Sequence, residues 1–296
     1  MTFVGCSVPE RFVNPLFEVF DGGEFILSSY RDVEERETRL RIYLDDPAKR
    51  EAATAALQSA LDVVGLAVEI APGEIADEDW KYSYRRHFKT EAIGESLLTV
   101  PVWELDEAKK AWGESGRKMI VLDPGLAFGT GKHETTRACL EYIDEVSREI
   151  PNGSFLDMGC GSGILSIAAA LLGFRTVAGF DVDREAVAAA RENAAANGVS
   201  VTYEHFALGR HAALPRALEN EKGAAFSLVA ANILGPLLIR FADEIVPHAA
   251  TFLILSGILS ELYGEVRAAY EARGFKERSN RTYGEWTTGL FVRETA

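Results

Sequence analysis

One stretch of nine residues, 155–163, constrains the fold more than any other part of the chain. It reads Phe-Leu-Asp-Met-Gly-Cys-Gly-Ser-Gly, so an apolar run leads into an acidic residue and then into three alternating glycines; a helical pattern begins at Ile164. Glycine reaches backbone conformations that other residues avoid, and it lets a ligand approach the main chain closely. The helix that follows directs its unpaired N–H groups at that ligand. The stretch therefore predicts a strand, a glycine turn and a helix around a nucleotide-like small molecule.

Beyond residue 120, strand patterns alternate with helical patterns. Strands are expected at 120–123, 155–156, 176–180, 199–203, 226–230 and 252–255, and helices at 134–146, 164–172, 184–196, 237–246 and 260–273. Asp183 is the expected N-cap of the third helix, and Gly198 lies just past its end. The chain closes with an expected antiparallel pair that turns near Gly284. Such alternation predicts an α/β fold with a doubly wound, mostly parallel sheet, which binds ligands at the carboxyl ends of its strands.

The first part of the chain predicts a smaller α+β domain over residues 1–75. Its expected elements are a hairpin turning at 21–23, a strand at 40–44, a helix that opens at Asp46-Pro47, and a strand at 66–70. This order contains one strand–helix–strand element after a hairpin. A connecting segment is expected over 76–118, followed by a catalytic domain over 119–296.

Aromatic and basic residues are mixed in the connecting segment. They are Trp80, Tyr82, Tyr84, Phe88, Arg85, Arg86 and Lys89. Aromatic rings among basic residues can stack on the bases of a nucleic acid. The alternative is an amphipathic connecting helix whose rings face a neighbouring domain. The acidic residues on both sides of the segment favour this alternative.

The charge of the chain restricts its partners. With 31 basic and 45 acidic residues among 296, the net charge is −14. Affinity for phosphate backbones comes mainly from lysine and arginine, so a general nucleic-acid binder is disfavoured. A small ligand or a basic protein partner suits this charge better. The alternative is that the acidity serves solubility alone.

The cysteines and the apolar runs bear on the compartment. The three cysteines, Cys6, Cys139 and Cys160, are odd in number and widely spaced, which indicates neither a disulfide framework nor a zinc site. The N-terminus lacks the basic start and the long apolar core of a signal peptide. The apolar run at 224–239 is short and contains polar residues and a proline. We therefore expect a cytoplasmic protein with no membrane span and no metal.

Two common nucleotide motifs fail on their spacing. The G-x-G-x-x-G fingerprint of dinucleotide sites requires a third glycine where this chain has Ile164 or Ser166. The phosphate loop G-x-x-x-x-G-K-[S/T] is nearly present at 131–132. However, Leu126 replaces its first glycine, and His133 replaces the hydroxyl that holds magnesium. NAD, ATP and GTP are therefore disfavoured.

An acidic residue completes the pattern. Asp181 lies at the end of the strand that follows the helix at 164–172, where a carboxylate can accept hydrogen bonds from both hydroxyls of a ribose. No phosphate-binding residue is evident, as expected for a nucleoside without phosphate. The combination resembles the class I S-adenosyl-L-methionine-dependent methyltransferases. In that class the glycine turn approaches the cofactor's amino-acid portion, and the acid holds the ribose.

Three further stretches narrow this resemblance: the loop at 122–136, Ala-Asn-Ile-Leu at 231–234, and Leu-Ser-Gly-Ile-Leu at 255–259. With the glycine turn, they resemble the bacterial methyltransferases that modify protein eleven of the large ribosomal subunit, over about 78–274. The resemblance implies a seven-stranded, Rossmann-like class I domain behind a substrate-recognition domain. It also implies methylation of amino groups, at lysine side chains and the α-amine, of a protein substrate that we expect to be a basic ribosomal protein.

The resemblance implies a set of site residues as well. The cofactor site would contain Thr136, Asp157, Gly159, Gly161, Asp181 and Asn232. Gly159 has no side chain to obstruct the methionine portion, and Asp181 accepts from the ribose. Thr136 offers a hydroxyl to the cofactor or serves only as a helix cap. Asn232, at a strand's carboxyl end, orients the cofactor or the incoming amine, which makes it the candidate catalytic residue; the alternative is an asparagine that fixes its loop.

The chain departs from the family pattern in two places. Lys132-His133-Glu134 stands where the family shows Thr-His-Pro, which alters the charge beside the cofactor loop. His133 is a candidate proton acceptor, although a loop histidine also serves as a hydrogen-bonding brace. In the first 70 residues only one of the two strand–helix–strand halves of a ferredoxin-like domain is recognisable, so the substrate is the least constrained inference. A monomer is favoured.

Two other functions share these features. A methyltransferase of nucleic acids or small molecules can use the same scaffold, but adenine-methylating enzymes place Asn/Asp-Pro-Pro and an aromatic residue where this chain has Asn-Ile-Leu-Gly at 232–235. A non-catalytic cofactor-binding protein is the other alternative. The intact glycine turn and Asp181 argue against it.

Overall fold

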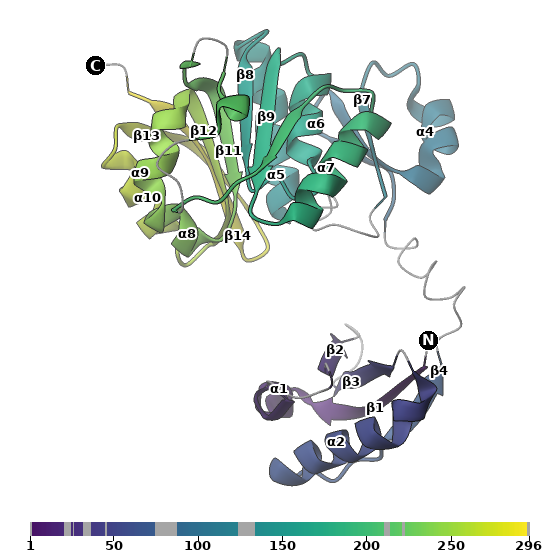
Figure 1. Ribbon diagram of the computed structural model, residues 1–296. Helices are drawn as coiled ribbons and strands as arrows, with labels where there is room; N and C mark the ends of the chain where they lie inside the picture. Colours follow the sequence, from purple (N-terminus) through teal and green to yellow (C-terminus); the bar gives the residue numbers. More distant parts are fainter. Residues whose placement is uncertain are drawn as a thin grey trace. The chain divides into compact units, whose positions relative to one another are not determined.

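The computed structural model describes residues 2–20, 25, 27–31, 37–44, 46–74, 88–123, 134–209, 214–220 and 223–294 (Figure 1). The chain forms two compact units, Met1–His87 and Phe88–Ala296. The division at 75/76 and 118/119 that the sequence suggests stays a prediction. Residues 80–87 of the aromatic stretch lie outside the described residues, whereas Phe88 and Lys89 begin the second unit.

The first unit is a four-stranded antiparallel sheet with two helices. Its elements are β1 (Thr2–Pro9), η1 (Glu10–Phe12), α1 (Val13–Phe20), β2 (Leu27–Arg31), β3 (Glu37–Leu44), η2 (Pro47–Lys49), α2 (Arg50–Val63) and β4 (Ala71–Glu74). The strand order is β2-β3-β1-β4. Both β1-α1-β2 and β3-α2-β4 are strand–helix–strand elements, and together they make the ferredoxin-like arrangement. The expectation of a single half is therefore wrong.

Two stretches of the first unit were assigned wrongly from the sequence, so only half of the ferredoxin-like arrangement was recognised. Residues 17–20 belong to α1 rather than to the strand of a hairpin, because apolar side chains at 13, 16 and 20 follow the helical spacing, with Leu16 fully buried. The last strand is at 71–74 instead of 66–70. It contains Pro72, which is compatible with pairing because β4 is an edge strand bonded only to β1. The helical stretch opens at Asp46-Pro47 as expected, but as the 3-10 helix η2, in which Asp46 Oδ1 accepts from the Ala48 N–H at 2.9 Å; α2 itself begins at Arg50.

The second unit contains a seven-stranded, mostly parallel sheet, as the resemblance implied. Its strands are β8 (Ser154–Met158), β9 (Thr176–Asp181), β10 (Thr202–His205), β11 (Phe226–Asn232), β12 (Ala249–Leu259), β13 (Phe275–Tyr283) and β14 (Trp286–Arg293). The order is β10-β9-β8-β11-β12-β14-β13, and only β14 runs against its neighbours. The order reverses between β8 and β11, which places a ligand crevice at their carboxyl ends.

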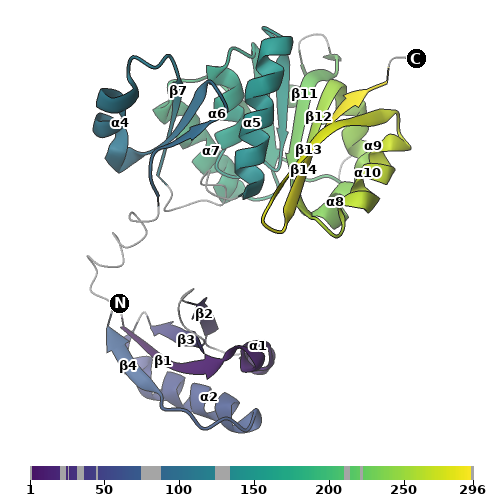
Figure 2. The ribbon, with the colours of Figure 1, turned by 180° about the vertical axis from the view of Figure 1, so that it is seen from behind.

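Helices cover both faces of this sheet (Figures 1 and 2). They are α5 (Glu134–Glu149), α6 (Ile164–Leu171) and α7 (Arg184–Ala196) on one face, and α8 (Gly235–Arg240), α9 (Ala242–Ile245) and α10 (Tyr263–Glu271) on the other, with the short turns η5 (Arg216–Leu218) and η7 (Val246–His248). Asp183 caps α7, because its carboxylate accepts from the Glu185 N–H at 2.9 Å. Each face has its own buried apolar cluster, so the sheet is a rigid support for the residues at its edge.

A small sheet precedes this domain within the same unit. It consists of β5 (Glu91–Ile93), β6 (Leu97–Pro101) and β7 (Lys118–Leu122), with η4 (Val102–Glu104) and α4 (Leu105–Trp112) between β6 and β7. Part of the expected connecting segment is therefore regular structure. The small sheet is fixed to α7, because Asn197 exchanges hydrogen bonds with both the N–H and the C=O of Val121, each at 2.7 Å.

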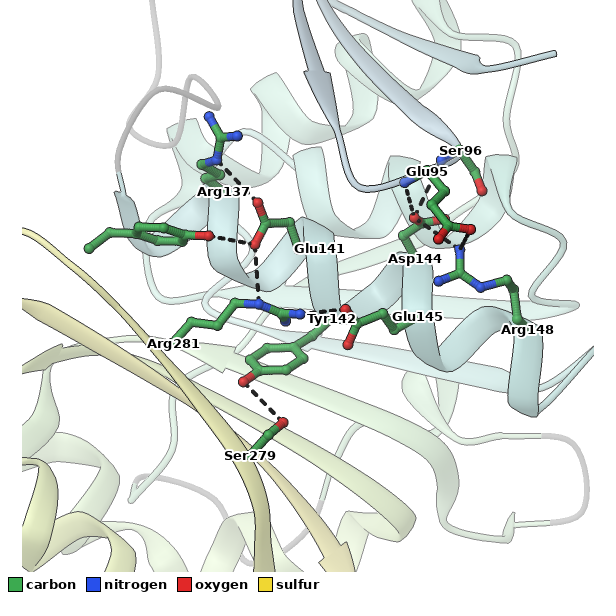
Figure 3. A network of polar contacts seen from close by, with 11 residues as sticks. Glu95, Ser96, Arg137, Glu141, Tyr142, Asp144, Glu145, Arg148, Ser279 and Arg281 are labelled. Atoms are coloured by element: carbon green, nitrogen blue, oxygen red, sulfur yellow. Dashed lines mark hydrogen bonds and ion pairs between the residues drawn. The ribbon is translucent and has the colours of Figure 1, made fainter. Parts of the chain in front are cut away.

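Polar contacts fix helix α5 on two sides (Figure 3). Asp144 is fully buried, and its Oδ2 accepts from the N–H groups of Glu95 and Ser96 at 2.7 and 3.3 Å. On the other side, Glu141 accepts from the Tyr283 hydroxyl at 2.9 Å and pairs with Arg281 at 3.3 Å. These contacts join α5 to the β5–β6 turn and to the terminal hairpin, so they fix the helix against both.

We expect Asp144→Ala to lower the free energy of unfolding by about 2 kcal/mol, because two backbone N–H groups lose their acceptor. Urea unfolding of the full chain measures this change. Glu145→Ala is the matched control, since its carboxylate is 41% exposed and should cost less than about 1 kcal/mol. Equal losses in the two variants would contradict the role given to Asp144.

Candidate cofactor-binding site

The glycine turn begins where β8 ends. Gly159, Gly161 and Gly163 have φ angles of +76°, +51° and +79°. These angles lie in the left-handed region of backbone conformations, which residues other than glycine rarely adopt. The N–H groups of Gly159 and Cys160 both donate to the carbonyl oxygen of Phe180 at 2.9 Å. The turn is therefore held against the end of the neighbouring strand β9.

Asp181 is the last residue of β9 and faces the turn. Its Oδ2 accepts from the Gly161 N–H at 2.9 Å, and its Oδ1 accepts from the Asp183 N–H at 3.0 Å. The residue is half-buried. A carboxylate offers about four acceptor positions, and two backbone donors leave the others available. The carboxylate is thus fixed in place and can still accept hydrogen bonds from a ligand.

A cavity of about 670 Å³ opens beside these residues, within the range typical of small-molecule sites. Four of the six expected site residues line it, namely Gly159, Gly161, Asp181 and Asn232. Asn232 is the last residue of β11, and within the described part of the chain its side-chain amide makes no hydrogen bond. The cavity therefore lies at the carboxyl ends of the parallel strands, around the position where the strand order reverses.

An apolar wall of the cavity was not among the sequence-based predictions. This wall includes Val182, Phe206, Leu208, Ile233, Leu237 and Phe241. Phe206 packs edge-on against Phe180, with the ring centroids 5.1 Å apart. The first residues after β9, β10 and β11 are Val182, Phe206 and Ile233, so their position after a parallel strand was the available signal. Such a wall suits the flat face of a nucleobase.

The other two expected site residues lie apart from the described cavity lining. Asp157 is fully buried in β8, and its Oδ2 accepts from the N–H and hydroxyl of Ser166 at 3.2 and 2.7 Å. Thr136 is buried in the first turn of α5, two residues after the helix begins, so it is not an N-cap. Residues 124–133, which include His133, lie outside the described part of the chain.

Asp157 is a candidate for a pH-dependent effect on stability. Burial raises the pKa of its carboxyl to about 7, and its Oδ1 has no partner within the described residues. The folded-state pKa is above the unfolded value, so the folded state binds the extra proton between about pH 4 and pH 7. The contribution of Asp157 to stability is therefore greatest at low pH and falls as the pH rises through this window.

We expect Asp157→Asn to remove this pH dependence, because the amide oxygen can still accept from Ser166 and carries no charge. Relative to the unsubstituted protein, the variant should gain about 2 kcal/mol of stability between pH 5 and pH 8. Urea unfolding at four pH values measures the gain. Parallel stability curves for the two proteins would show that the carboxyl is ionised throughout.

Comparison with known proteins identifies the family. The model of the family described as "Ribosomal protein L11 methyltransferase (PrmA)" matches residues 20–294. The chain belongs to this family. The family member from Trichlorobacter lovleyi is 36% identical over 84% of this chain and 80% of its own length, and the member from Azotobacter vinelandii is 43% identical over 67% and 62%.

A solved structure of the family agrees with the fold. The ribosomal protein L11 methylase of Lactobacillus delbrueckii subsp. bulgaricus superposes with a TM-score of 0.57 at 28% identity, and it covers 70% of this chain and 100% of its own. Among the described residues of the present family member, no helix combines the length and apolarity needed to cross a bilayer. The same residues contain no cluster of three or more His, Cys, Asp or Glu side chains suited to a metal ion.

Proposed function

We propose that this protein transfers methyl groups from S-adenosyl-L-methionine to amino groups of ribosomal protein L11, at lysine side chains, the α-amine or both. The observation that carries the proposal is the position of Asp181. Its carboxylate is held by two backbone N–H groups at the rim of a cavity whose wall includes Gly159 and Asn232. The family membership of the chain supports the same reaction.

The residues of the cavity fit this cofactor. A Cβ at Gly159 would lie 2.5 Å from Ile233 Cγ2, so a glycine keeps the passage beside the turn open. Asp181 would accept from the ribose, and the apolar wall would contact the adenine. Arg240 is the one basic side chain among the described lining residues, which suits a nucleoside without phosphates.

The remaining expected contacts belong to the proposal as well. Gly161 shapes the turn and anchors Asp181 through its N–H. Asp157 would act from beneath the turn, where its Oδ1 has no partner in the described chain. Thr136 would act from the first turn of α5. Asn232 would orient the incoming amine.

The chemistry makes limited demands on the protein. When bound, S-adenosylmethionine supplies an electrophilic methyl group on a sulfonium. The cavity residues must align the nucleophile with that methyl group, and alignment of this kind can lower a barrier by several kcal/mol. The amine must also be neutral, and deprotonating lysine at pH 7 costs about 4–5 kcal/mol. Burial of the amine in an uncharged part of the pocket would lower its pKa and this cost, so we assign no general base.

The division of labour between the two units is also part of the proposal. The ferredoxin-like unit would recognise the substrate protein, and the second unit would hold the cofactor and the reacting amine. The net charge of −14 supports a basic protein partner rather than a phosphate backbone. We propose that the protein acts in the cytoplasm, where ribosomal proteins are made, as a monomer.

The proposal is tested by incubating the full chain with S-adenosylmethionine and purified ribosomal protein L11. Intact-mass measurements should show L11 gaining whole methyl groups, and fragmentation should place them on lysine Nζ atoms or on the α-amine. L11 with acetylated amines is the control and should gain none. In a cell extract, radiolabel that resisted protease and disappeared with nuclease would contradict a protein substrate.

We expect Gly159→Ala to weaken cofactor binding about tenfold or more, because the methyl group meets Ile233 and the residue must keep a positive φ. Gly173→Ala is the matched control, since Gly173 has a φ of +94° and open space around its Cβ position. The control should lose stability through backbone strain and retain affinity. Isothermal titration with S-adenosylmethionine compares the two variants, and equal affinities would remove Gly159 from the site.

A further inference from the structure

A second groove lies beside the proposed active site, at the carboxyl ends of β11 and β12. Its volume is about 480 Å³, and residues at the starts of α8, α10 and β14 line it. The groove and the cofactor cavity share one segment of chain. Asn232 and Ile233 line the cavity, and Leu234 and Gly235 line the groove. A molecule in the groove would therefore lie next to Asn232.

The shared segment is held rigidly by close packing. Gly257 has a φ of +76°, and a Cβ there would lie 2.4 Å from the carbonyl oxygen of Ile233. A Cβ at Gly235 would lie 2.7 Å from Leu262 Cδ2. Both glycines let the segment approach β12 and the start of α10. The wall between the two sites is thus a fixed feature of the domain.

The rim of the groove exposes apolar side chains. Leu234 is 61% exposed and Leu259 is 39% exposed, and both line the groove. Trp286 pairs across the sheet with Leu259 and adds a half-buried ring. Exposed apolar groups gathered around one hollow are typical of an interaction site rather than of an ordinary surface.

The charged residues of the groove are both acidic. Glu261 lies in the turn before α10 and Glu265 in the first turn of that helix, and both are exposed and line the groove. Neither forms an ion pair within the described residues, and Arg267 of the same helix pairs with Glu277 at 3.9 Å instead. No basic side chain is among the described residues that line the groove. Two unpaired carboxylates beside leucines suit a cation next to an apolar group.

We propose that this groove binds a segment of the protein substrate in which a lysine or arginine stands next to an apolar residue. The cation would pair with Glu261 and Glu265, and the apolar side chain would pack on Leu234 and Leu259. The inference rests on the proposed function, since it assigns the groove to the protein that is methylated. It makes the two glutamates specificity-determining residues that hold the substrate while a neighbouring amine reaches Asn232.

The test is the double substitution Glu261→Gln and Glu265→Gln, assayed with purified L11 and S-adenosylmethionine. We expect KM for L11 to rise about fivefold, because two exposed ion pairs to the substrate are lost. The kcat and the cofactor affinity should stay unchanged. The difference from the unsubstituted enzyme should shrink as salt rises, since added ions screen exposed pairs. Leu234→Ala should also raise KM for L11.

The matched control is the double substitution Glu192→Gln and Glu271→Gln. Both residues are exposed on helices of the same unit, so the control changes the net charge equally, and it should leave KM unchanged. If the groove and control variants have the same KM, the groove inference is wrong and the proposed function stands. If the unsubstituted enzyme does not methylate L11, both are overturned.

Discussion

Asp181→Ala is expected to weaken the binding of S-adenosylmethionine about 100-fold. Two hydrogen bonds from ribose hydroxyls to a charged acceptor would be lost, each contributing roughly 1.5–3 kcal/mol. The substitution also removes the acceptor of the Gly161 and Asp183 N–H groups, which lie 2.9 and 3.0 Å from the carboxylate. Isothermal titration of the full chain with the cofactor measures the change.

The control for this prediction separates a specific acceptor from a general charge. Glu185 also lines the cavity, and Glu185→Gln removes the same single charge. It should change the dissociation constant less than about threefold, because an exposed charge acts through a screened interaction. If both variants bind the cofactor equally well, Asp181 does not hold the ribose. Thermal unfolding of both variants shows whether the turn has kept its fold.

The polar residues that line the cavity could be predicted from the sequence because the carboxyl ends of parallel strands lie at the same edge of a sheet. Asp181 was expected from its place after a strand, and Asn232 was expected from the family resemblance. Each is the last residue of a parallel strand, so both lie at one edge of the sheet. The three alternating glycines at 159–163 indicate a turn before the helix that begins at Ile164. No knowledge of side-chain packing was required to bring these residues together.

Other features depend on contacts that no local pattern encodes. The apolar wall was missed because Phe206 and Leu237 look like ordinary core residues in sequence, and only the positions of β10 and α8 direct them into the cavity. The edge strand at 71–74 was missed because Ala-Pro-Gly reads as a turn, whereas its pairing with β1 is decided by the rest of the sheet.

The cofactor cavity and the groove of the second unit together suggest how a substrate amine would be positioned. The cofactor cavity and the acidic groove share the segment from Asn232 to Gly235. This segment packs closely against Gly257 of β12, where a Cβ would lie 2.4 Å from the carbonyl oxygen of Ile233. A substrate bound in the groove would lie next to Asn232, and under the proposal this residue would link substrate binding to methyl transfer.

Asn232→Ala is therefore expected to lower kcat for L11 methylation about 100-fold or more, the usual cost of removing a group that orients or polarises the reacting atoms. The amide of Asn232 is half-buried, lines the cavity and has no hydrogen-bond partner in the described chain, so its loss should affect stability little. Cofactor affinity should change less than about threefold, since the proposed role is toward the amine. Single-turnover assays with saturating L11 measure the chemical step directly.

Asn232→Asp distinguishes orientation of the amine from a loop-fixing role. The carboxylate keeps an acceptor of nearly the same shape and adds a negative charge, which favours the ammonium form of the substrate. The pH–rate profile of this variant should therefore shift to higher pH, with partial recovery of kcat in alkaline solution. A purely structural asparagine would give the same profile as the unsubstituted enzyme. That outcome, or unchanged turnover in Asn232→Ala, would remove Asn232 from the reaction.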